Sequence, residues 1–375
     1  MTPKTLKLSS KYVVPFNNLR ESLRPDQDRL EKAFRDTVED GRFILGPRVE
    51  AFEKRFAEYN NLKYGIGVAS GTDAITMALA AAGLGEGDIV LTVANSAPPT
   101  VCAIKAAGCG VRFADVDHRG LFEPTQLRNK RLIEGVRAVV VVHLYGRIVN
   151  IPAMTDACDA AGIAIIEDAA QAAGSVCNDY AIGSRSLAAC FSFYPTKNLG
   201  CLGDGGMVLT NSEVIANRVK IARNYGIIDG KQVFYADNSR LDEVQAAFLD
   251  VRLDSLEKVN ENRRQLSIHY RRGLDKMKYV RPSEVLRGEN CHLYTIHCDE
   301  REHLQKYLDA QGIQTMIHYP IPAHKMPVEK ANFYSNSLVN TEDHCRTVLS
   351  LPCWYGMKDL QADIVIRAIR KFYHE

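Results

Sequence analysis

The segment SFYPTKNLGCLGDGG, from Ser192 to Gly206, places one lysine, Lys197, between a Pro-Thr pair and a run of glycines. A lysine amine that is fixed in space can form a covalent bond with an aldehyde, whereas an amine on a solvated loop needs no chemical role. The glycines at 200, 203, 205 and 206 allow the backbone to approach other groups closely. Taken alone, Lys197 fits a surface lysine as well as a reactive one, so the other candidate residues must decide.

Two acids follow an apolar run in the segment IIEDAAQAAGS, from Ile165 to Ser175. A carboxylate at the end of a buried strand is costly unless it has partners. Asp168 is suited to hold the cationic nitrogen of a heterocycle, and Gln171 could reach a neighbouring ring substituent. In the alternative, one of the acids Glu167 and Asp168 faces solvent or caps the next helix.

A third candidate segment is ASGTDAI, from Ala69 to Ile75, between a predicted strand and a predicted helix. Gly71 permits a tight turn, and Thr72 and Asp73 would present backbone N–H groups at the start of the helix. Such N–H groups bind phosphate. An ordinary helix cap explains the same residues.

These segments together match the requirements of pyridoxal phosphate. Lys197 would bond to the aldehyde, and Asp168 would keep the pyridine nitrogen protonated. Gly71, Thr72 and the hydroxyl of Ser192 would hold the phosphate. No spacing of cysteine, histidine or acidic residues indicates a metal site.

The candidates need a scaffold that brings strand ends together, and the hydrophobic pattern predicts one. Apolar strands alternate with helices, which predicts an α/β fold with a mostly parallel central sheet and helices on both faces. The predicted strands are 64–68, 89–93, 111–114, 138–142, 163–166 and 188–191, and the predicted helices are 25–40, 49–59, 73–82, 99–107 and 151–161. After residue 240 the pattern changes to one or two long helices over 241–274 and then to shorter elements. We therefore expect a large domain at 1–250 and a smaller C-terminal α+β domain at 251–375.

The composition bounds the class of protein. The chain has 375 residues, 46% of them hydrophobic, and a formal net charge of +2. This near-neutral charge gives no reason to expect nucleic acid or an anionic membrane as a partner. We find no secretory signal and no apolar run of membrane-spanning length, and the ten scattered cysteines fit reduced thiols. These features predict a cytoplasmic protein.

The sequence resembles a known family, the DegT/DnrJ/EryC/StrS nucleotide-sugar aminotransferases. The resemblance runs from about residue 14 to residue 365. The matching phrases are FILGPRVEAFEKRFAEY, GVASGTDAITMAL, VVHLYG, IIEDAAQAAGS, SFYPTKNLGCLGDGGMVLT, ARNYG, NSRLDEVQAAFLD, IHYPIPAH and LSLPC. The resemblance implies fold type I of the pyridoxal phosphate enzymes, the aspartate aminotransferase-like fold.

The resemblance also implies roles for single residues. For Lys197, Asp168, Gly71, Thr72 and Ser192 it implies the same contacts with the cofactor that are proposed above. Gln171 would lie beside the ring oxygen of the cofactor. Asn238 would reach the phosphate from the other subunit of a homodimer, so that the active sites are shared. Tyr319 and His324 lie in a phrase that is near the sugar or nucleotide in related enzymes.

The sequence departs from the family pattern at two places. Many relatives stack an aromatic residue on the cofactor ring, and the corresponding position here is Ala97. The phrase YADN, which ends at Asn238, lacks a glycine that many relatives have. Some members replace the reactive lysine by histidine and are dehydratases, whereas Lys197 favours transamination.

The resemblance implies an aminotransferase that uses glutamate as the amino donor and a nucleotide sugar as the acceptor. The phrases NSRLDE and ANSAPPT resemble those of members that act at C3 of 3-keto-6-deoxyhexoses, and we expect a dTDP-linked sugar of this kind. The alternatives are a 4-keto sugar, a keto-cyclitol, or a non-catalytic regulatory relative.

Overall fold

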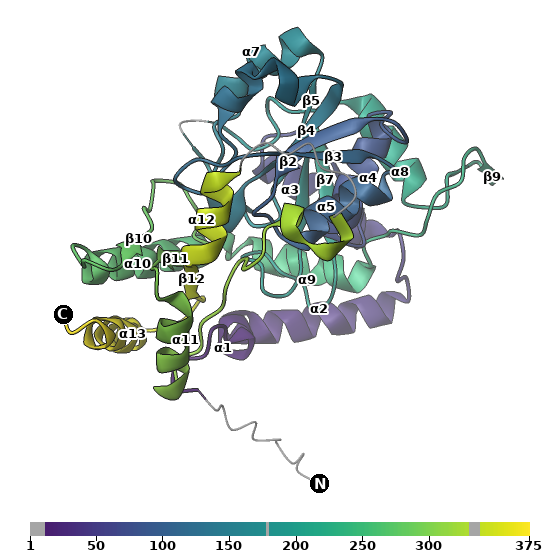
Figure 1. The fold of residues 1–375 in the computed structure, drawn as a ribbon. Coiled ribbons are helices and arrows are strands. Elements are labelled where there is room, and N and C mark those ends of the chain that lie inside the picture. Colours follow the sequence, from purple (N-terminus) through teal and green to yellow (C-terminus); the bar gives the residue numbers. More distant parts are fainter. Residues whose placement is uncertain (1–11, 178–179, 330–337) are drawn as a thin grey trace.

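The protein has an α/β fold built around one seven-stranded sheet (Figure 1). The computed structural model describes residues 12–177, 180–329 and 338–375. The strand order is β1-β7-β6-β5-β4-β2-β3. Strand β7 runs antiparallel to both neighbours, and the pairs β2–β3, β2–β4, β4–β5 and β5–β6 are parallel. The mostly parallel sheet that the sequence predicted is therefore confirmed.

The strands of the main sheet are β1 (Tyr64–Val68), β2 (Ile89–Val93), β3 (Gly110–Ala114), β4 (Val136–Val142), β5 (Ala164–Asp168), β6 (Ala188–Ser192) and β7 (Gly206–Thr210). The helices of this part of the chain are α1 (Leu19–Leu23), α2 (Gln27–Asp40), α3 (Pro47–Tyr59), α4 (Gly71–Ala81), α5 (Pro98–Ala106), α6 (Lys130–Ile133), α7 (Pro152–Ala161), α8 (Glu213–Ala222) and α9 (Glu243–Leu253). A short hairpin, β8 (Ile227–Ile228) and β9 (Lys231–Gln232), projects from the body (Figure 1).

Helices cover both faces of this sheet, because its central strands are apolar on both sides. In β4, Val139 and Val141 join one core with side chains of α3, α7 and α9. Ala138 and Val140 join a second core with side chains of α4, α5 and α8. The continuous apolar run of β4 is thus the expected signature of a strand buried on both faces.

The C-terminal part has its own three-stranded antiparallel sheet, β10 (Arg281–Pro282), β11 (Tyr294–His297) and β12 (Val348–Leu351). Its helices are α10 (Leu256–Leu274), α11 (Arg301–Ala310), α12 (Val339–Thr347) and α13 (Asp359–Phe372). The change of core falls within α10, because Leu256 packs in the large core whereas Leu266 and Leu274 pack in the small one. The division into 1–250 and 251–375 stays a prediction.

The predicted elements agree with the structure to within a few residues at their ends. The region predicted as one or two long helices forms two, α9 and α10. Among the helices of the described ranges, none has both the length and the apolar character to cross a membrane.

One buried carboxylate joins two distant segments of the chain. Glu243, at the start of α9, is buried. It accepts hydrogen bonds from the N–H groups of Gly46 (2.8 Å), Arg48 (2.9 Å) and Val49 (2.9 Å) at the start of α3. The negative charge caps N–H groups that have no partner within the helix. Gly46 leaves room for it, because a Cβ there would lie 2.8 Å from Glu243 Oε2.

We expect Glu243→Ala to lower the free energy of unfolding by about 2–3 kcal/mol, because three N–H groups at the start of α3 lose their acceptor. Urea unfolding monitored by circular dichroism measures this. Glu50→Ala is the matched control, because Glu50 lies in the first turn of α3, beside the capped N–H groups, but its side chain is exposed. Equal effects of the two substitutions would show that the buried cap is unimportant.

Candidate active site

A cavity of about 380 Å³ lies at the edge of the sheet where the parallel strands end. Parallel α/β sheets bind ligands at this edge. Seven of the predicted site residues line this one cavity: Gly71, Thr72, Asp168, Gln171, Ser192, Lys197 and Tyr319. The fold therefore brings together segments that are far apart in the chain, since Gly71 and Tyr319 are separated by 248 positions.

Asp168 is the last residue of β5 and is buried at the cavity wall. Its Oδ2 accepts a hydrogen bond from the Thr100 hydroxyl at 2.7 Å, and its Oδ1 accepts one from the Ala170 N–H at 3.1 Å. These two donors fix the orientation of the carboxylate. Each oxygen keeps a further lone pair for another donor.

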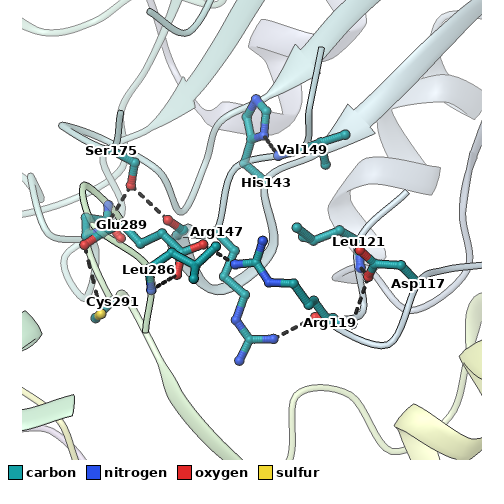
Figure 2. Close-up of polar contacts among 12 residues, drawn as sticks. Asp117, Arg119, Leu121, His143, Arg147, Val149, Ser175, Leu286, Glu289 and Cys291 are labelled. Carbon is teal, nitrogen blue, oxygen red and sulfur yellow. Dashed lines mark hydrogen bonds and ion pairs between the residues drawn. The ribbon is translucent and has the colours of Figure 1, made fainter. Parts of the chain in front are cut away.

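The structure excludes the alternative that Glu167 or Asp168 faces solvent or caps a following helix. Neither acid faces solvent, and β5 is followed by a turn rather than a helix. Glu167 accepts hydrogen bonds from the Tyr180 hydroxyl (2.7 Å) and the Gly183 N–H (2.8 Å). Its other oxygen lies 2.7 Å from His143 Nε2. The Val149 N–H donates to His143 Nδ1 at 3.2 Å (Figure 2), so Nε2 carries the hydrogen that is donated to Glu167.

Lys197 lies in the loop that follows β6, and its N–H donates to the Tyr194 carbonyl at 2.8 Å. Burial lowers the pKa of its amine from 10.5 to about 8, and the charge of Asp168 opposes this shift. A substantial fraction of the amine is therefore neutral near physiological pH. A neutral amine is the nucleophilic form, and a lysine that is surrounded by water does not have this property.

The start of α4 meets the end of β6 and the start of β7 with almost no intervening space. A Cβ on Gly71 would lie 2.7 Å from Ser192 Cβ, and one on Gly206 would lie 2.3 Å from the Ser70 carbonyl group. The Asp73 N–H donates to the Ser70 hydroxyl at 3.1 Å, so the cap already uses it. Within the described ranges no hydrogen bond is found for the N–H groups of Gly71 and Thr72. These two donors, with the Ser192 hydroxyl, are suited to an anion.

Gln171 links the cavity to the turn that follows β4. Its Oε1 accepts a hydrogen bond from the Tyr145 N–H at 2.6 Å, and its Nε2 donates to the Tyr319 hydroxyl at 3.3 Å. Burial raises the pKa of Tyr319 to about 12, so this hydroxyl stays protonated at neutral pH. Gln171 and Tyr319 thus form one polar wall of the cavity.

The turn that carries Tyr145 is held by Arg147, Arg119 and Glu289, none of which lines the cavity. Figure 2 shows these three side chains in one cluster. The Arg147 guanidinium lies 5.1 Å from the centre of the Tyr145 ring and donates to the Arg119 carbonyl at 2.6 Å. Arg119 in turn forms an ion pair with the buried Glu289. This cluster supports the cavity wall from behind.

Two predicted site residues lie elsewhere. Asn238 is exposed and does not line the cavity of its own chain. The side chain of His324 lies 3.1 Å from a carboxylate oxygen of Glu342 and is also absent from the lining. Ala97, at the position where relatives have an aromatic residue, does line the cavity, so the wall there is small and apolar.

Among the lining residues that the sequence analysis did not select are Thr100, His292 and His318. Thr100 holds Asp168, and burial together with the charge of Lys197 lowers the pKa of His318 to about 4. His318 stands in the same phrase as His324, IHYPIPAH, so this phrase also supplies a histidine of the lining, while the role of His324 stays a prediction. His292 has no motif of its own that could have indicated it.

The chain is similar to known proteins over nearly its whole length. The model of the DegT/DnrJ/EryC1/StrS aminotransferase family matches residues 25–370. A "Pleiotropic regulatory protein" of Geobacillus stearothermophilus is 37% identical over 370 residues, which covers 96% of this chain and 98% of that protein. The dTDP-3-amino-3,4,6-trideoxy-alpha-D-glucose transaminase of Streptomyces venezuelae is 36% identical over 367 residues and 96% of each chain.

A solved structure confirms the predicted fold class. The crystal structure of S. venezuelae DesV in complex with a ketimine intermediate has a TM-score of 0.92 and 35% sequence identity. The match covers 96% of this chain and 99% of that one. The fold is that of the sugar aminotransferases, as the sequence resemblance implied.

The lowered pKa of Lys197 predicts that Lys197→Met stabilises the cofactor-free protein at pH 7, by a few degrees in Tm. The folded state binds the lysine proton less tightly than the unfolded state, so the charged amine costs stability below about pH 8. The cost falls as the pH rises from about 8 toward 10.5, because the amine in the folded state becomes neutral first.

Unfolding free energies of wild type and Lys197→Met are measured across this pH range and subtracted. The contributions of the other titrating groups are common to both proteins and cancel in the difference. The advantage of Lys197→Met must be largest below pH 8 and shrink above it. A difference that is independent of pH, or a less stable variant, would contradict the lowered pKa.

Proposed function

The chain belongs to the DegT/DnrJ/EryC1/StrS aminotransferase family, and we propose that it transfers an amino group from glutamate to a dTDP-linked 3-keto-6-deoxysugar. The observation that carries the proposal is the juxtaposition of Lys197 and Asp168 in one cavity, with burial lowering the pKa of the amine to about 8. The family is one of pyridoxal phosphate-dependent aminotransferases, and the reaction class follows from it.

The residues of the cavity fit pyridoxal phosphate. Gly71, Thr72 and Ser192 converge where a Cβ on Gly71 would leave no room, and they would hold the phosphate. Asp168, fixed by Thr100, would hold the ring nitrogen, and Lys197 would hold the aldehyde. When bound, this cofactor withdraws electrons from the Cα of the amino donor.

The chain's own groups supply the remaining requirements of transamination. The Lys197 amine removes the proton from the donor Cα as a general base, which its lowered pKa permits near neutral pH. Asp168 remains close enough to stabilise positive charge in the cavity. The protonated Tyr319 hydroxyl and the Gln171 amide orient polar groups beside the reacting atoms.

The names of the relatives support a 3-keto sugar. Three relatives at 35–36% identity are transaminases whose names specify dTDP-3-amino sugars. A relative at 26% identity is named GDP-perosamine synthase, and it is more distant. The regulatory name of the relative from G. stearothermophilus keeps a non-catalytic role as the second candidate. The presence of Lys197, Asp168 and Ser192 together at one cavity favours catalysis over a non-catalytic role.

The test supplies the purified protein with pyridoxal phosphate, glutamate and separate 3-keto and 4-keto nucleotide sugars, and identifies products by mass spectrometry. We expect amination of the dTDP-linked 3-keto sugar. Lys197→Ala should reduce turnover by at least about a thousandfold, because a covalent catalyst is removed. Lys105→Ala is the control, because Lys105 is exposed on α5. Exclusive amination of the 4-keto sugar, or no amination, would refute the proposed substrate.

We propose further that the protein is a homodimer with shared active sites. Asn238 is exposed on its own chain, as a residue that serves a neighbouring site would be. The adjacent hairpin projects from the body (Figure 1), and the segment that follows it carries exposed apolar side chains at Val233, Phe234 and Tyr235. Such a patch favours contact with another protein surface.

Mixing two inactive variants tests the sharing. Lys197→Ala and Asn238→Ala are each expected to impair both sites of a homodimer. In a heterodimer with shared sites, one site carries both defects and the other carries neither, so subunit exchange should restore up to about half of the wild-type sites. Labelled subunits verify exchange by native mass spectrometry. Exchange without recovery would show that each chain builds its own site.

A further inference from the structure

Asn198 follows Lys197 directly, is 4% exposed and does not line the active-site cavity. On the basis of the proposed function, we infer that Asn198 is a positioning residue for Lys197. Its amide fastens the lysine loop, defined as residues 193–201, to α10 and to the segment 290–292. Through these contacts it sets the place of Lys197 relative to the turn that follows Asp168.

The lysine loop sets part of its shape by its own backbone, but outside contacts must set its place in the molecule. Within the loop, the Lys197 N–H donates to the Tyr194 carbonyl at 2.8 Å. From outside, the Arg252 guanidinium donates to the Gly200 carbonyl near the end of the loop. The Asn198 side chain supplies outside contacts directly beside the lysine.

The Asn198 amide makes three hydrogen bonds to groups that are shielded from water. Its Nδ2 donates to the amide oxygen of Asn260, on α10, at 2.8 Å and to the Asn290 carbonyl at 3.0 Å. Its Oδ1 lies 3.0 Å from His292 Nδ1. Asn260, Asn290 and His292 are all buried. Both N–H bonds of the amide and one lone pair of its oxygen are therefore used.

The donors and acceptors of these bonds have one consistent arrangement, because backbone carbonyls only accept hydrogen bonds. The Asn260 Nδ2 donates to the Ala173 carbonyl at 3.1 Å, so the Asn260 Oδ1 is the atom that faces Asn198. The nitrogen of the Asn198 amide faces that oxygen and the Asn290 carbonyl. Its oxygen therefore faces His292, and His292 Nδ1 carries the hydrogen of that bond.

The same buried cluster is attached to the turn that carries the other predicted cofactor contacts. The Asn290 Nδ2 donates to the carbonyls of Gln171 and Ala173, each at 3.0 Å. Both carbonyls belong to the turn that follows β5, whose last residue is Asp168. Asn290 thus accepts from Asn198 through its own carbonyl and donates to this turn through its side chain, which joins the lysine loop to the end of β5.

A buried network in which the polar groups are satisfied is rigid, so the backbone at Lys197 is held while its side chain is left to move. Catalysis by a positioned base is sensitive to displacements of about 1 Å. Burial lowers the pKa of the Lys197 amine to about 8, and the charge of Asp168 opposes this shift. A displaced loop would admit water to the amine, so this pKa also reports the position of the loop.

The test compares Asn198→Ala, which removes all three hydrogen bonds, with Asn60→Ala. Asn60 is the matched control, because it is also a buried asparagine, its Nδ2 donates to the Phe56 carbonyl at 2.7 Å, and it does not line the active-site cavity. Both substitutions should lower the Tm by a few degrees, because each removes buried hydrogen bonds. Asn198→Ala alone should change the chemistry of Lys197.

The primary readout is the pKa of the Lys197 amine in the cofactor-free full-length chain, from the pH dependence of its acylation followed by peptide mass spectrometry. Asn198→Ala should raise this pKa by about one unit from about 8 toward 10.5, because the amine gains water. With pyridoxal phosphate, glutamate and the keto sugar, kcat should fall by about tenfold at unchanged KM. Asn60→Ala should leave the pKa, kcat and KM at their wild-type values.

The inference requires both changes in a folded Asn198→Ala variant, so an unchanged pKa or an unchanged kcat would overturn it. Equal changes in Asn60→Ala would also overturn it, because they would show a general effect of lost stability. Failure of the wild-type chain to aminate any sugar would refute the proposed function instead, and the pKa of the cofactor-free amine would then decide on Asn198 alone.

A second variant covers the case that Asn198→Ala does not fold. Asn260→Ala leaves Asn198 two of its three hydrogen bonds and should raise the Lys197 pKa by a smaller amount, and an unchanged value would overturn the inference. If neither variant folds, native-state hydrogen exchange of the wild type decides. The Lys197 N–H must exchange as slowly as that of Val140 in the centre of β4, and faster exchange would refute a fixed loop.

Discussion

The rest of the site depends on one constraint, the position of the Lys197 amine. This amine lies in a cavity where burial lowers its pKa more than the attraction of Asp168 raises it. An ammonium that is only partly compensated costs free energy, so the surrounding fold must hold it in place. The sheet does this by ending several strands at one edge, where the lysine loop, the Asp168 carboxylate and the start of α4 meet. Glycine at positions 71 and 206 permits this contact, because any larger residue would separate the helix from the strands.

The end of β5 shows how a strand assigns different roles to adjacent acids. Successive side chains of a strand point to opposite faces, so Glu167 and Asp168 enter different environments. Glu167 accepts hydrogen bonds from several donors, including His143 and Tyr180, and fastens the segment around 180–186 to the sheet. Asp168 has fewer donors and keeps capacity for a ligand. A shift of one residue in the register of β5 would exchange the two roles.

The sequence predicted the parts of the structure that local pattern determines. Apolar runs located the strands, and because strand ends of a parallel sheet share one edge, Lys197, Asp168 and Gly71 could be expected to meet. The rest depends on tertiary contacts that no local pattern encodes. Thr100 and His292 reach the cavity from segments 68 and 124 positions away from Asp168. The burial of both acids of β5 also depends on partners from later segments, so the solvent-facing alternative could not be rejected from the sequence.

The charge of the cavity connects the proposed chemistry to the proposed assembly. Among its described lining residues, Lys197 is the sole side chain with a strongly basic group, and Asp168 and Asp204 are acidic. Burial keeps His292 and His318 neutral at physiological pH. The proposed substrates carry a diphosphate and two carboxylates, and such anions are bound by charge-assisted hydrogen bonds. The cavity of one chain does not supply the matching cations, so groups from outside its lining must do so. In the homodimer that we propose, the neighbouring subunit that brings Asn238 is the expected source of these groups.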